Sequence, residues 1–426
     1  MVQHFFLHRK FHFYLTLAVI GTTLISWFNF NSLLIMLLLA CRLLDGKPAE
    51  TLKAAFSNKF FLAWFAVFLL DLAGLTYTHH FFTGWKYVES KATLLAIPFI
   101  LCGGPFTDKT TRNRFLSAYC GLLFLICLYC LAMAAWQFMQ YRDPRVFFYH
   151  ALLSPFFINA IFFSAYVLSA LLFLLSSPLD FGADPIRAGW LTPSRLRQIR
   201  IGLIIFFIGM IVLLSSKLLL VLTIIILISF LYKRAAYHSG LLKRPVILLG
   251  IAAIIGTGLL AITDNPVKDR YKEMTQGDLR LYRQERQAPF TVFNGISLRL
   301  LIWRSAVEIL NDQNAWIMGV SAGDAQDLLN KKYLSRINSG FLGYNFHNEY
   351  IEILVRSGLV GLFVFLAACG SLILLARSAG TKEAWFTVII VLLLCLTESM
   401  LEMQHSAFFC CFFPLLNLPA SADSAI

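Results

Sequence analysis

The stretch YNFHNEYIEILVRSGLVGLFVFL, residues 344–366, begins with a polar cluster and continues as an apolar run. The cluster contains His347, Asn348 and Glu349, and further charges follow at Glu352 and Arg356. An apolar run approaching roughly 20 residues is long enough for a helix that crosses a bilayer. Charged side chains at the start of such a helix must face protein or a water-filled cavity, because lipid cannot solvate them. The stretch therefore predicts a membrane helix with a polar entrance.

The composition of the whole chain agrees with a membrane protein. Of 426 residues, 58% are hydrophobic and only 14% are charged, with a mean hydropathy of +0.71. A water-soluble domain needs more polar surface than this. Apolar runs that recur between short polar segments predict an all-α polytopic membrane protein with about twelve transmembrane helices. The predicted spans are residues 12–28, 31–44, 60–76, 86–102, 115–139, 153–176, 199–214, 218–232, 245–263, 349–376, 385–397 and 401–417.

The basic residues set the predicted orientation of these spans. Lys and Arg concentrate in alternate connecting segments, such as the one that holds Arg42, Lys47, Lys53 and Lys59. Basic segments of this kind stay in the cytoplasm, so both termini are expected there. The same distribution explains the net charge of +13 by topology, and no nucleic-acid partner is expected.

One hydrophilic segment breaks the alternation of spans and short connections. Residues 264–346 lie between the ninth and tenth predicted spans, on the side away from the cytoplasm. A loop of this length is usually functional. The expected organisation is nine membrane helices in residues 1–263, a partly helical loop domain in residues 264–346, and three membrane helices in residues 347–426.

A helix is predicted within this loop at SLRLLIWRSAVEILND, residues 297–312. At 100° per residue, its apolar side chains share one broad face. Arg304 and Glu308 lie together on the other face, as a solvated pair at i and i+4. Arg299 falls inside the apolar face, where a charge is costly without a partner. Arg299 is therefore expected to snorkel toward water, to pair with a local carboxylate, or to bind an anionic substrate.

A second short helix is predicted after a glycine turn at GVSAGDAQDLLNKKY, residues 319–333, where Asp324 is a possible helix cap. In the stretch at 344–366, Glu352 and Arg356 have i, i+4 spacing and can neutralise each other. Gly358 and Gly361 permit a close contact between helices.

His347 allows two interpretations. Taken as part of the helix, it lies opposite the Glu352–Arg356 pair, but its direction is not set if Asn348 is the helix cap. Zinc is a poor explanation, because the loop has no Cys and His347 has no His partner at helical spacing. A lone histidine at a membrane interface is ordinarily structural, and a catalytic base is the alternative.

Two further polar features are expected on the non-cytoplasmic side. Lys217 follows two serines at the start of the eighth predicted span, either as an interfacial lysine or as an anion ligand. The segment TESMLEMQHS, residues 397–406, supplies Glu398, Glu402 and His405 between the last two spans.

Together these motifs resemble the O-antigen ligase/O-antigen polymerase superfamily. The resemblance covers the topology from about residue 115 onward and is most specific at the His-Asn motif before the apolar helix. The matching segments are HNEY at 347–350, GLVG at 358–361, Arg299 with Trp303, GVSAGD at 319–324, and SSK at 215–217, where ligases usually have Arg in place of Lys217.

The resemblance implies a glycosyltransferase of the bacterial inner membrane with a periplasmic active site. Its donor would be a glycan on undecaprenyl diphosphate, and its acceptor the lipid A–core oligosaccharide, with inversion and without metal or cofactor. His347 would activate the acceptor hydroxyl, Arg299 and Lys217 would bind the diphosphate, and Asn348, Glu349 and Arg304 would support them. An O-antigen polymerase and a protein O-oligosaccharyltransferase are the alternatives within the superfamily, and a transporter is the alternative outside it.

Overall fold

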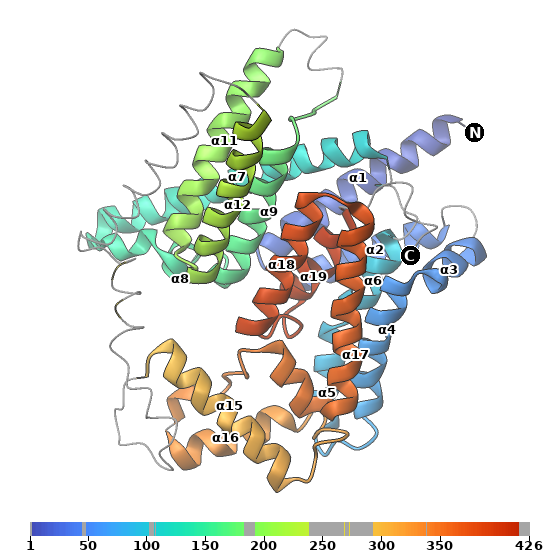
Figure 1. Ribbon diagram of the computed structural model, residues 1–426, viewed down its shortest axis with the longest axis vertical. Helices are drawn as coiled ribbons and strands as arrows, with labels where there is room; N and C mark the ends of the chain where they lie inside the picture. The colour runs from blue at the N-terminus through green and yellow to red at the C-terminus, as the bar shows by residue number, and fades with distance from the viewer. Residues whose placement is uncertain are drawn as a thin grey trace. The chain divides into compact units, whose positions relative to one another are not determined.

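The computed structural model describes residues 2–44, 48–101, 106, 108–182, 192–237, 268, 272, 293–337 and 339–416. The described residues form helices and no β-strand (Figure 1). The expected all-helical class is confirmed for this part of the chain. The ninth predicted span, residues 245–263, lies outside the described residues, as does most of the first half of the predicted loop.

Several helices have the length and composition of membrane spans. Within the described residues, α7 (Lys109–Tyr141), α11 (Pro193–Leu214) and α17 (Glu349–Ala379) are each long and apolar enough to cross a bilayer. The bent pair of α2 (Phe28–Leu44) and α3 (Pro48–Ser57) would make a fourth. These helices are those of a multi-pass membrane protein, and the number twelve stays a prediction.

The remaining predicted spans on described residues also coincide with helices, but one of them is broken. The span predicted at 86–102 is two helices, α5 (Phe81–Ser90) and α6 (Thr93–Leu101). The chain turns between them at Lys91, which is fully buried and bonds to Asp71 with an Nζ–Oδ2 distance of 2.8 Å. Hydropathy alone did not reveal this interruption, because the sequence of residues 86–102 predicts one continuous span. Further helices are α1 (Val2–Leu24), α4 (Lys59–Gly74), α8 (Tyr149–Leu152), α9 (Ala160–Ser176), α12 (Lys217–Tyr237), α18 (Lys382–Thr397) and α19 (Gln404–Leu416).

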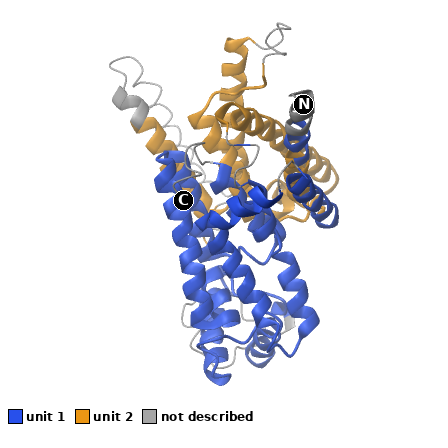
Figure 2. Ribbon diagram, turned by 90° about the vertical axis from the view of Figure 1, so that its right-hand side faces the viewer, with its two compact units in different colours: residues 1–15, 28–107, 273–426 blue, residues 16–27, 108–272 orange. Residues whose placement is uncertain are grey.

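The chain divides into two compact units (Figure 2). Unit 1 contains residues 1–15, 28–107 and 273–426, and unit 2 contains residues 16–27 and 108–272. Arg299 and His347 belong to unit 1, whereas Lys217 belongs to unit 2. The division at residues 263 and 346, which rests on membrane topology, stays a prediction.

Unit 2 is built around α9, which is buried on all sides between its neighbours α7, α11 and α12. A helix that is apolar all round is expected to be enclosed in this way. Side-chain caps fix where the helices begin: Asp108 accepts from Thr110 and Thr111, and Asn159 accepts from Ile161.

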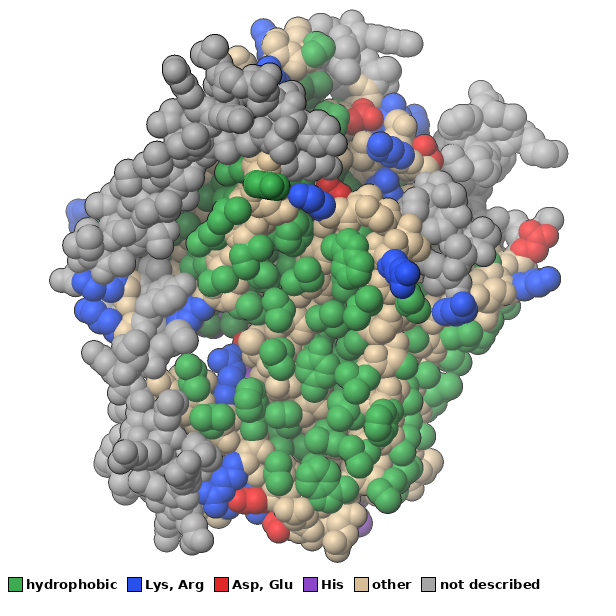
Figure 3. Space-filling model, in the orientation of Figure 1, with side chains coloured by type: hydrophobic (Ala, Val, Ile, Leu, Met, Phe, Trp, Pro, Cys, Tyr) green, Lys and Arg blue, Asp and Glu red, His purple; other side chains and the backbone are tan. Residues whose placement is uncertain are grey.

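Unit 1 is organised by α17, which packs against α4 and α18. Its second half leaves Phe363, Leu366 and Leu374 exposed. Figure 3 shows that apolar side chains gather over the face on which α17 lies. An exposed apolar face on a helix of this length is the surface that lipid would contact.

Two shorter helices precede α17: α15 (Gly295–Asp312) and α16 (Ala325–Arg336). They confirm the two helices predicted within the loop segment. A capping box starts α15, in which Asn294 accepts from the Ser297 amide and Ser297 accepts from the Asn294 amide. The two helices share a core with the start of α17, formed by Ile302, Ala306, Ile309, Leu310, Leu329, Tyr333, Phe346 and Val355.

The helix α17 is interrupted at Gly358, whose φ is 66° and ψ is −163°. The backbone of the turn before α16 fills the interruption. Val320 and Ser321 donate to the carbonyls of Val355 and Arg356 at 2.8 and 2.9 Å, and Leu359 donates to the carbonyl of Trp316 at 2.8 Å. These bonds satisfy backbone groups that a broken helix would leave unpaired.

Glycine is required on both sides of this contact. A Cβ on Gly358 would lie 2.2 Å from the Ile317 carbonyl oxygen, and a Cβ on Gly319 would lie 2.4 Å from the Arg356 carbonyl. The expectation that Gly358 permits a close contact is therefore correct, but its neighbour is a loop backbone. The glycine turn predicted at residues 319–324 therefore packs directly against the backbone of α17 at its interruption.

Gly358→Ala is expected to destabilise the fold by on the order of 1–3 kcal/mol, because this φ/ψ region is essentially closed to other residues. Gly370→Ala in the same helix is the matched control, since its Cβ would meet nothing within 4 Å. Thermal unfolding of the purified protein in detergent measures both. Equal unfolding temperatures for the two variants would show that the close contact at Gly358 does not stabilise the fold.

Candidate functional site

The polar entrance of α17 is a loop followed by a capped helix. The Asn348 side chain accepts a hydrogen bond from the Ile351 amide at 3.2 Å, so the helix begins at Glu349. His347 therefore precedes the helix, and helical phase does not set its direction. Its backbone is left-handed, with φ of 48°, and its amide donates to Asn345 Oδ1 at 3.0 Å. A non-glycine residue in this conformation is uncommon and must be held by its surroundings.

The His347 ring points toward the end of α18. Its Nδ1 lies 3.4 Å from Glu398 Oε2, and the ring of Tyr344 stands edge-on at 5.9 Å between centroids. Glu398 is only 5% exposed, whereas the His347 side chain is 28% exposed. The histidine is thus open to a ligand on one side and backed by a covered carboxylate on the other.

Arg299 reaches the same carboxylate from α15. Its Nη2 donates to Glu398 Oε1 at 2.8 Å and to the Thr397 carbonyl at 3.1 Å. Arg299 therefore pairs with a carboxylate, as one of the sequence-based expectations for it stated. We call this three-residue arrangement of His347, Glu398 and Arg299 the Glu398 bridge.

Arg299 is not saturated by these contacts. Its side chain is 31% exposed. Its Nη1 makes only a 3.5 Å contact with the Gly295 carbonyl, whereas its Nε is buried and has no hydrogen-bond partner among the described residues. A guanidinium carries five N–H donors, so Arg299 keeps donors for an anion.

The next turn of α15 fixes the backbone beside His347. The Trp303 indole Nε1 donates to the carbonyl of Phe346 at 3.0 Å. The Phe346 side chain is 1% exposed and lies in the core shared with α15 and α16. Arg299 and Trp303 are four residues apart on α15, and each is linked to His347 through one other group. Arg299 is linked through the Glu398 carboxylate, and Trp303 through the carbonyl of Phe346.

A buried ion cluster contacts the loop that precedes α17. Arg356 Nη2 lies 2.7 Å from Glu352 Oε1, which confirms the pairing of these residues, and it also bonds to Glu402. Glu352 Oε2 accepts from the Phe346 amide at 3.2 Å and from Ser399 Oγ at 2.8 Å. The prediction of a self-neutralising pair was therefore too simple, because two carboxylates share one guanidinium.

Glu402 and a further buried carboxylate, Glu349, bond to the loops that carry the Glu398 bridge. Glu402 Oε2 accepts from Asn345 Nδ2 at 2.7 Å, two residues before His347. Glu349 Oε2 accepts from the Leu401 amide at 2.8 Å. The cluster thus holds the segment before α17 and the turn between α18 and α19 at a fixed separation.

The cluster continues toward α5 through an aromatic ring. The Arg356 guanidinium lies 3.5 Å from the Tyr87 ring centroid, and Lys91 Nζ lies 4.1 Å from the same centroid. Lys91 in turn pairs with Asp71. Cation–π contacts of this kind are stronger when water is excluded.

Arg304 belongs to a different ion cluster, between α15 and α16. Its Nε bonds to Glu308 at 2.9 Å, which is the predicted i, i+4 pair, and Lys332 and Arg336 bond to the same carboxylate. Burial alone would raise the pKa of Glu308, but the hydrogen bonds and charges of Arg336 and Lys332 outweigh it, so the pKa lies below its usual value. A supporting role of Arg304 at the site stays a prediction.

Asp324 does not cap α16 with its side chain, although it occupies the cap position. Its carboxylate instead accepts from the amides of His79 and His80 and from His80 Nδ1, which lies 2.7 Å away. Burial opposes ionisation of Asp324, but these bonds prevail and lower its pKa. The predicted cap position is confirmed, but the side chain makes no cap bond, because its partners come from a turn some 240 residues earlier.

Lys217 begins α12 in unit 2, two residues after the left-handed Ser215 that ends α11. It is half-buried. Its role as a second cation for an anionic ligand stays a prediction.

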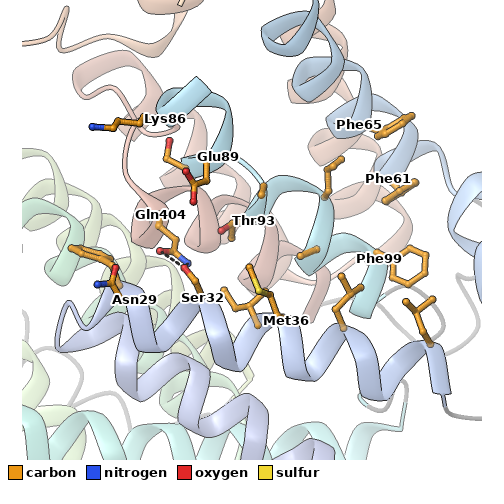
Figure 4. Close-up of a pocket in the computed structure, with 18 of the residues that line it drawn as sticks. Asn29, Ser32, Met36, Phe61, Phe65, Lys86, Glu89, Thr93, Phe99 and Gln404 are labelled. Carbon is orange, nitrogen blue, oxygen red and sulfur yellow. Dashed lines mark hydrogen bonds between the residues drawn. The ribbon is translucent and has the colours of Figure 1, made fainter. Parts of the chain in front are cut away.

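A cavity of about 680 Å³ lies elsewhere in unit 1, between α2, α4 and α6 (Figure 4). Its lining is mainly apolar, with Asn29, Ser32 and Gln404 toward one end. Neither Arg299 nor His347 lines it, so it is separate from the Glu398 bridge. Over the described ranges, no group of three or more His, Cys, Asp and Glu side chains converges as metal ligands would.

The comparison with known families agrees with the sequence motifs. A family model described as O-antigen ligase matches residues 201–366, which include Lys217, Arg299 and His347. Over the matched segment, this result agrees with the resemblance to the O-antigen ligase/polymerase superfamily. Among curated proteins, no match to the chain was found.

Arg356→Met is expected to destabilise the protein by about 3–5 kcal/mol, because it leaves Glu352 buried without its cation. Lys331→Ala is the control, since Lys331 and Asp327 form a pair whose lysine is 67% exposed, and such pairs contribute about 0–1 kcal/mol. Chemical unfolding monitored by tryptophan fluorescence would compare them. A loss no larger for Arg356→Met than for Lys331→Ala would show that the cluster is not structural.

Proposed function

We propose that the protein is an O-antigen ligase. It transfers a glycan from undecaprenyl diphosphate to the lipid A–core oligosaccharide, at the periplasmic face of the bacterial inner membrane. The observation that carries this proposal is the Glu398 bridge, in which an accessible histidine and an accessible arginine share one covered carboxylate. Both residues lie within the segment that matches the O-antigen ligase model.

His347 is the proposed general base. With Nδ1 directed at Glu398 and carrying its proton there, the lone pair of Nε2 is left for the acceptor hydroxyl. An imidazole can accept such a proton near neutral pH. The carboxylate behind the ring orients it and stabilises the imidazolium that forms, as in other carboxylate–histidine pairs.

The transfer then proceeds by direct displacement. The acceptor hydroxyl loses its proton to His347 Nε2, and its oxygen bonds to the anomeric carbon of the donor. The bond between this carbon and the diphosphate oxygen breaks, and the electron pair leaves with the diphosphate. Attack opposite to departure inverts the anomeric centre.

The leaving diphosphate requires fixed positive charge. Arg299 has guanidinium donors available for phosphate oxygens, and such charge-assisted bonds stabilise negative charge as it develops. Lys217 is the proposed second cation, and an ammonium group contacts phosphate as a point charge without bidentate geometry. This scheme uses no metal and no cofactor.

The residues around the Glu398 bridge have supporting roles in this proposal. Asn348 starts the helix after His347, and Glu349 holds the turn that follows Glu398. Arg304 steadies α15 on the side away from the apolar core through Glu308. The remaining members of the superfamily, polymerases and protein O-oligosaccharyltransferases, differ in acceptor and stand as alternatives.

His347→Ala is expected to lower the rate of glycan transfer by about 10²–10⁴-fold, the usual contribution of a general base. The assay uses purified full-length protein with lipid-linked donor and lipid A–core acceptor. His79→Ala is the control, because that histidine is exposed and bonds to Asp324 through its backbone amide. Full activity of a correctly inserted His347→Ala protein would refute the assignment.

Deletion of the gene is expected to separate ligase from polymerase. A strain without the ligase should accumulate lipid-linked polymer and make lipopolysaccharide that lacks O-antigen. Electrophoresis of lipopolysaccharide, with extraction of lipid-linked glycans, measures both. Lipopolysaccharide that carries a single repeat unit would favour the polymerase instead.

A further inference from the structure

Glu398 holds two partners at unequal distances. Its Oε1 lies 2.8 Å from Arg299, within the range of a strong charge-assisted bond. Its Oε2 lies 3.4 Å from His347 Nδ1, which is longer than an ordinary N–H···O bond. In this structure the carboxylate is therefore bound mainly to Arg299 and only loosely to the histidine.

The exposure of the three residues favours a change in this balance when an anion binds. Arg299 and His347 are each about a third exposed or slightly less, whereas Glu398 is covered. An anionic ligand can reach the guanidinium but not the carboxylate. Its charge would compete with Glu398 for Arg299 and weaken the Arg299–Glu398 bond.

We infer that Glu398 is a positioning residue that couples binding of the donor diphosphate to activation of His347. When the diphosphate contacts Arg299, the Glu398 carboxylate transfers its main hydrogen bond from Arg299 to His347 Nδ1. The imidazole is then oriented and made more basic only when a donor is present. This inference rests on the proposed function, since it assigns the diphosphate to Arg299 and the base to His347.

The rest of the site permits this exchange without a backbone movement. Glu398 follows the last turn of α18, where its amide donates to the Leu394 carbonyl. The His347 backbone is held by Asn345 and Trp303 through contacts that do not involve Glu398. Only the distance between the carboxylate and the imidazole has to shorten, as often occurs when a substrate completes a site.

Within the described ranges, two groups contact the His347 ring: the Glu398 carboxylate from the end of α18 and the Tyr344 ring from its own loop. Arg299 from α15 acts on the ring through the shared carboxylate. Neutralisation of Arg299 by a diphosphate makes the surroundings of His347 more negative, which favours the protonated ring.

The test measures acylation of His347 by diethyl pyrocarbonate, which reacts with neutral imidazole, across about pH 5.5–8. Full-length protein in nanodiscs is compared with and without undecaprenyl diphosphate, and the modified peptide is quantified by mass spectrometry. We expect the ligand to raise the pH of half-maximal acylation by about 0.5 or more, a threefold change in proton affinity. Simple shielding would lower the maximal rate and leave this midpoint unchanged.

Two variants separate the coupling from a purely structural role. Glu398→Gln should still bind undecaprenyl diphosphate, but the ligand should no longer move the midpoint. In transfer assays its kcat should fall about tenfold or more, with a donor KM that is unchanged or lower because Arg299 is released. Glu383→Gln, at the opposite end of the same helix, should behave as the unmodified protein.

A midpoint that the bound ligand does not move would overturn the coupling, as would an equal shift in Glu398→Gln. Either result leaves the proposed function intact if His347→Ala still abolishes transfer. Full transfer by His347→Ala would instead refute the proposed function itself, whatever the acylation shows.

Discussion

A single buried guanidinium, that of Arg356, stabilises the geometry of the site. It lies just before the interruption of α17 and is bonded to both Glu352 and Glu402. Charges this deeply covered are costly unless they are paired, so the cluster tolerates few arrangements. Through the second oxygens of the two carboxylates, that constraint passes to Phe346, Asn345 and Ser399. His347 and Glu398 are next to these residues in the chain, so the ion cluster also helps to fix their positions.

The interruption at Gly358 separates two parts of α17, one that faces the protein interior and one that exposes apolar side chains. Before it, α17 directs Glu349, Glu352 and Arg356 into the protein. After it, the helix exposes apolar side chains as a lipid-facing span would. The loop that enters the interruption connects α15 to α16, so the break joins the membrane helix to α15, the helix that carries both Arg299 and Trp303.

Local features of the chain were predictable from the sequence. Apolar runs indicated the helices, the i, i+4 spacing indicated the Glu352–Arg356 and Arg304–Glu308 pairs, and the misplaced charge of Arg299 indicated a partner. The identity of that partner was not predictable. Glu398 lies almost 100 positions from Arg299 and about 50 from His347, and no periodicity relates such distances. Its only signal was a polar segment between two predicted spans.

The errors have the same physical origin. Asp324 has the sequence of a helix cap, yet its carboxylate is used by the turn at His79 and His80. The predicted span at 86–102 has the hydropathy of one helix, yet the chain turns at Lys91, which pairs with Asp71 of α4. In both cases a contact between distant segments prevails over a local preference, as tertiary interactions commonly do.

The central claim is that a lipid diphosphate binds at Arg299 beside His347, above a carboxylate that both residues share. A cryo-electron microscopy structure of the full chain in nanodiscs with undecaprenyl diphosphate tests it most directly. The diphosphate should lie within hydrogen-bonding distance of the Arg299 guanidinium, with Glu398 closer to His347 Nδ1 than the present 3.4 Å. A diphosphate bound away from Arg299 and His347 would contradict the claim.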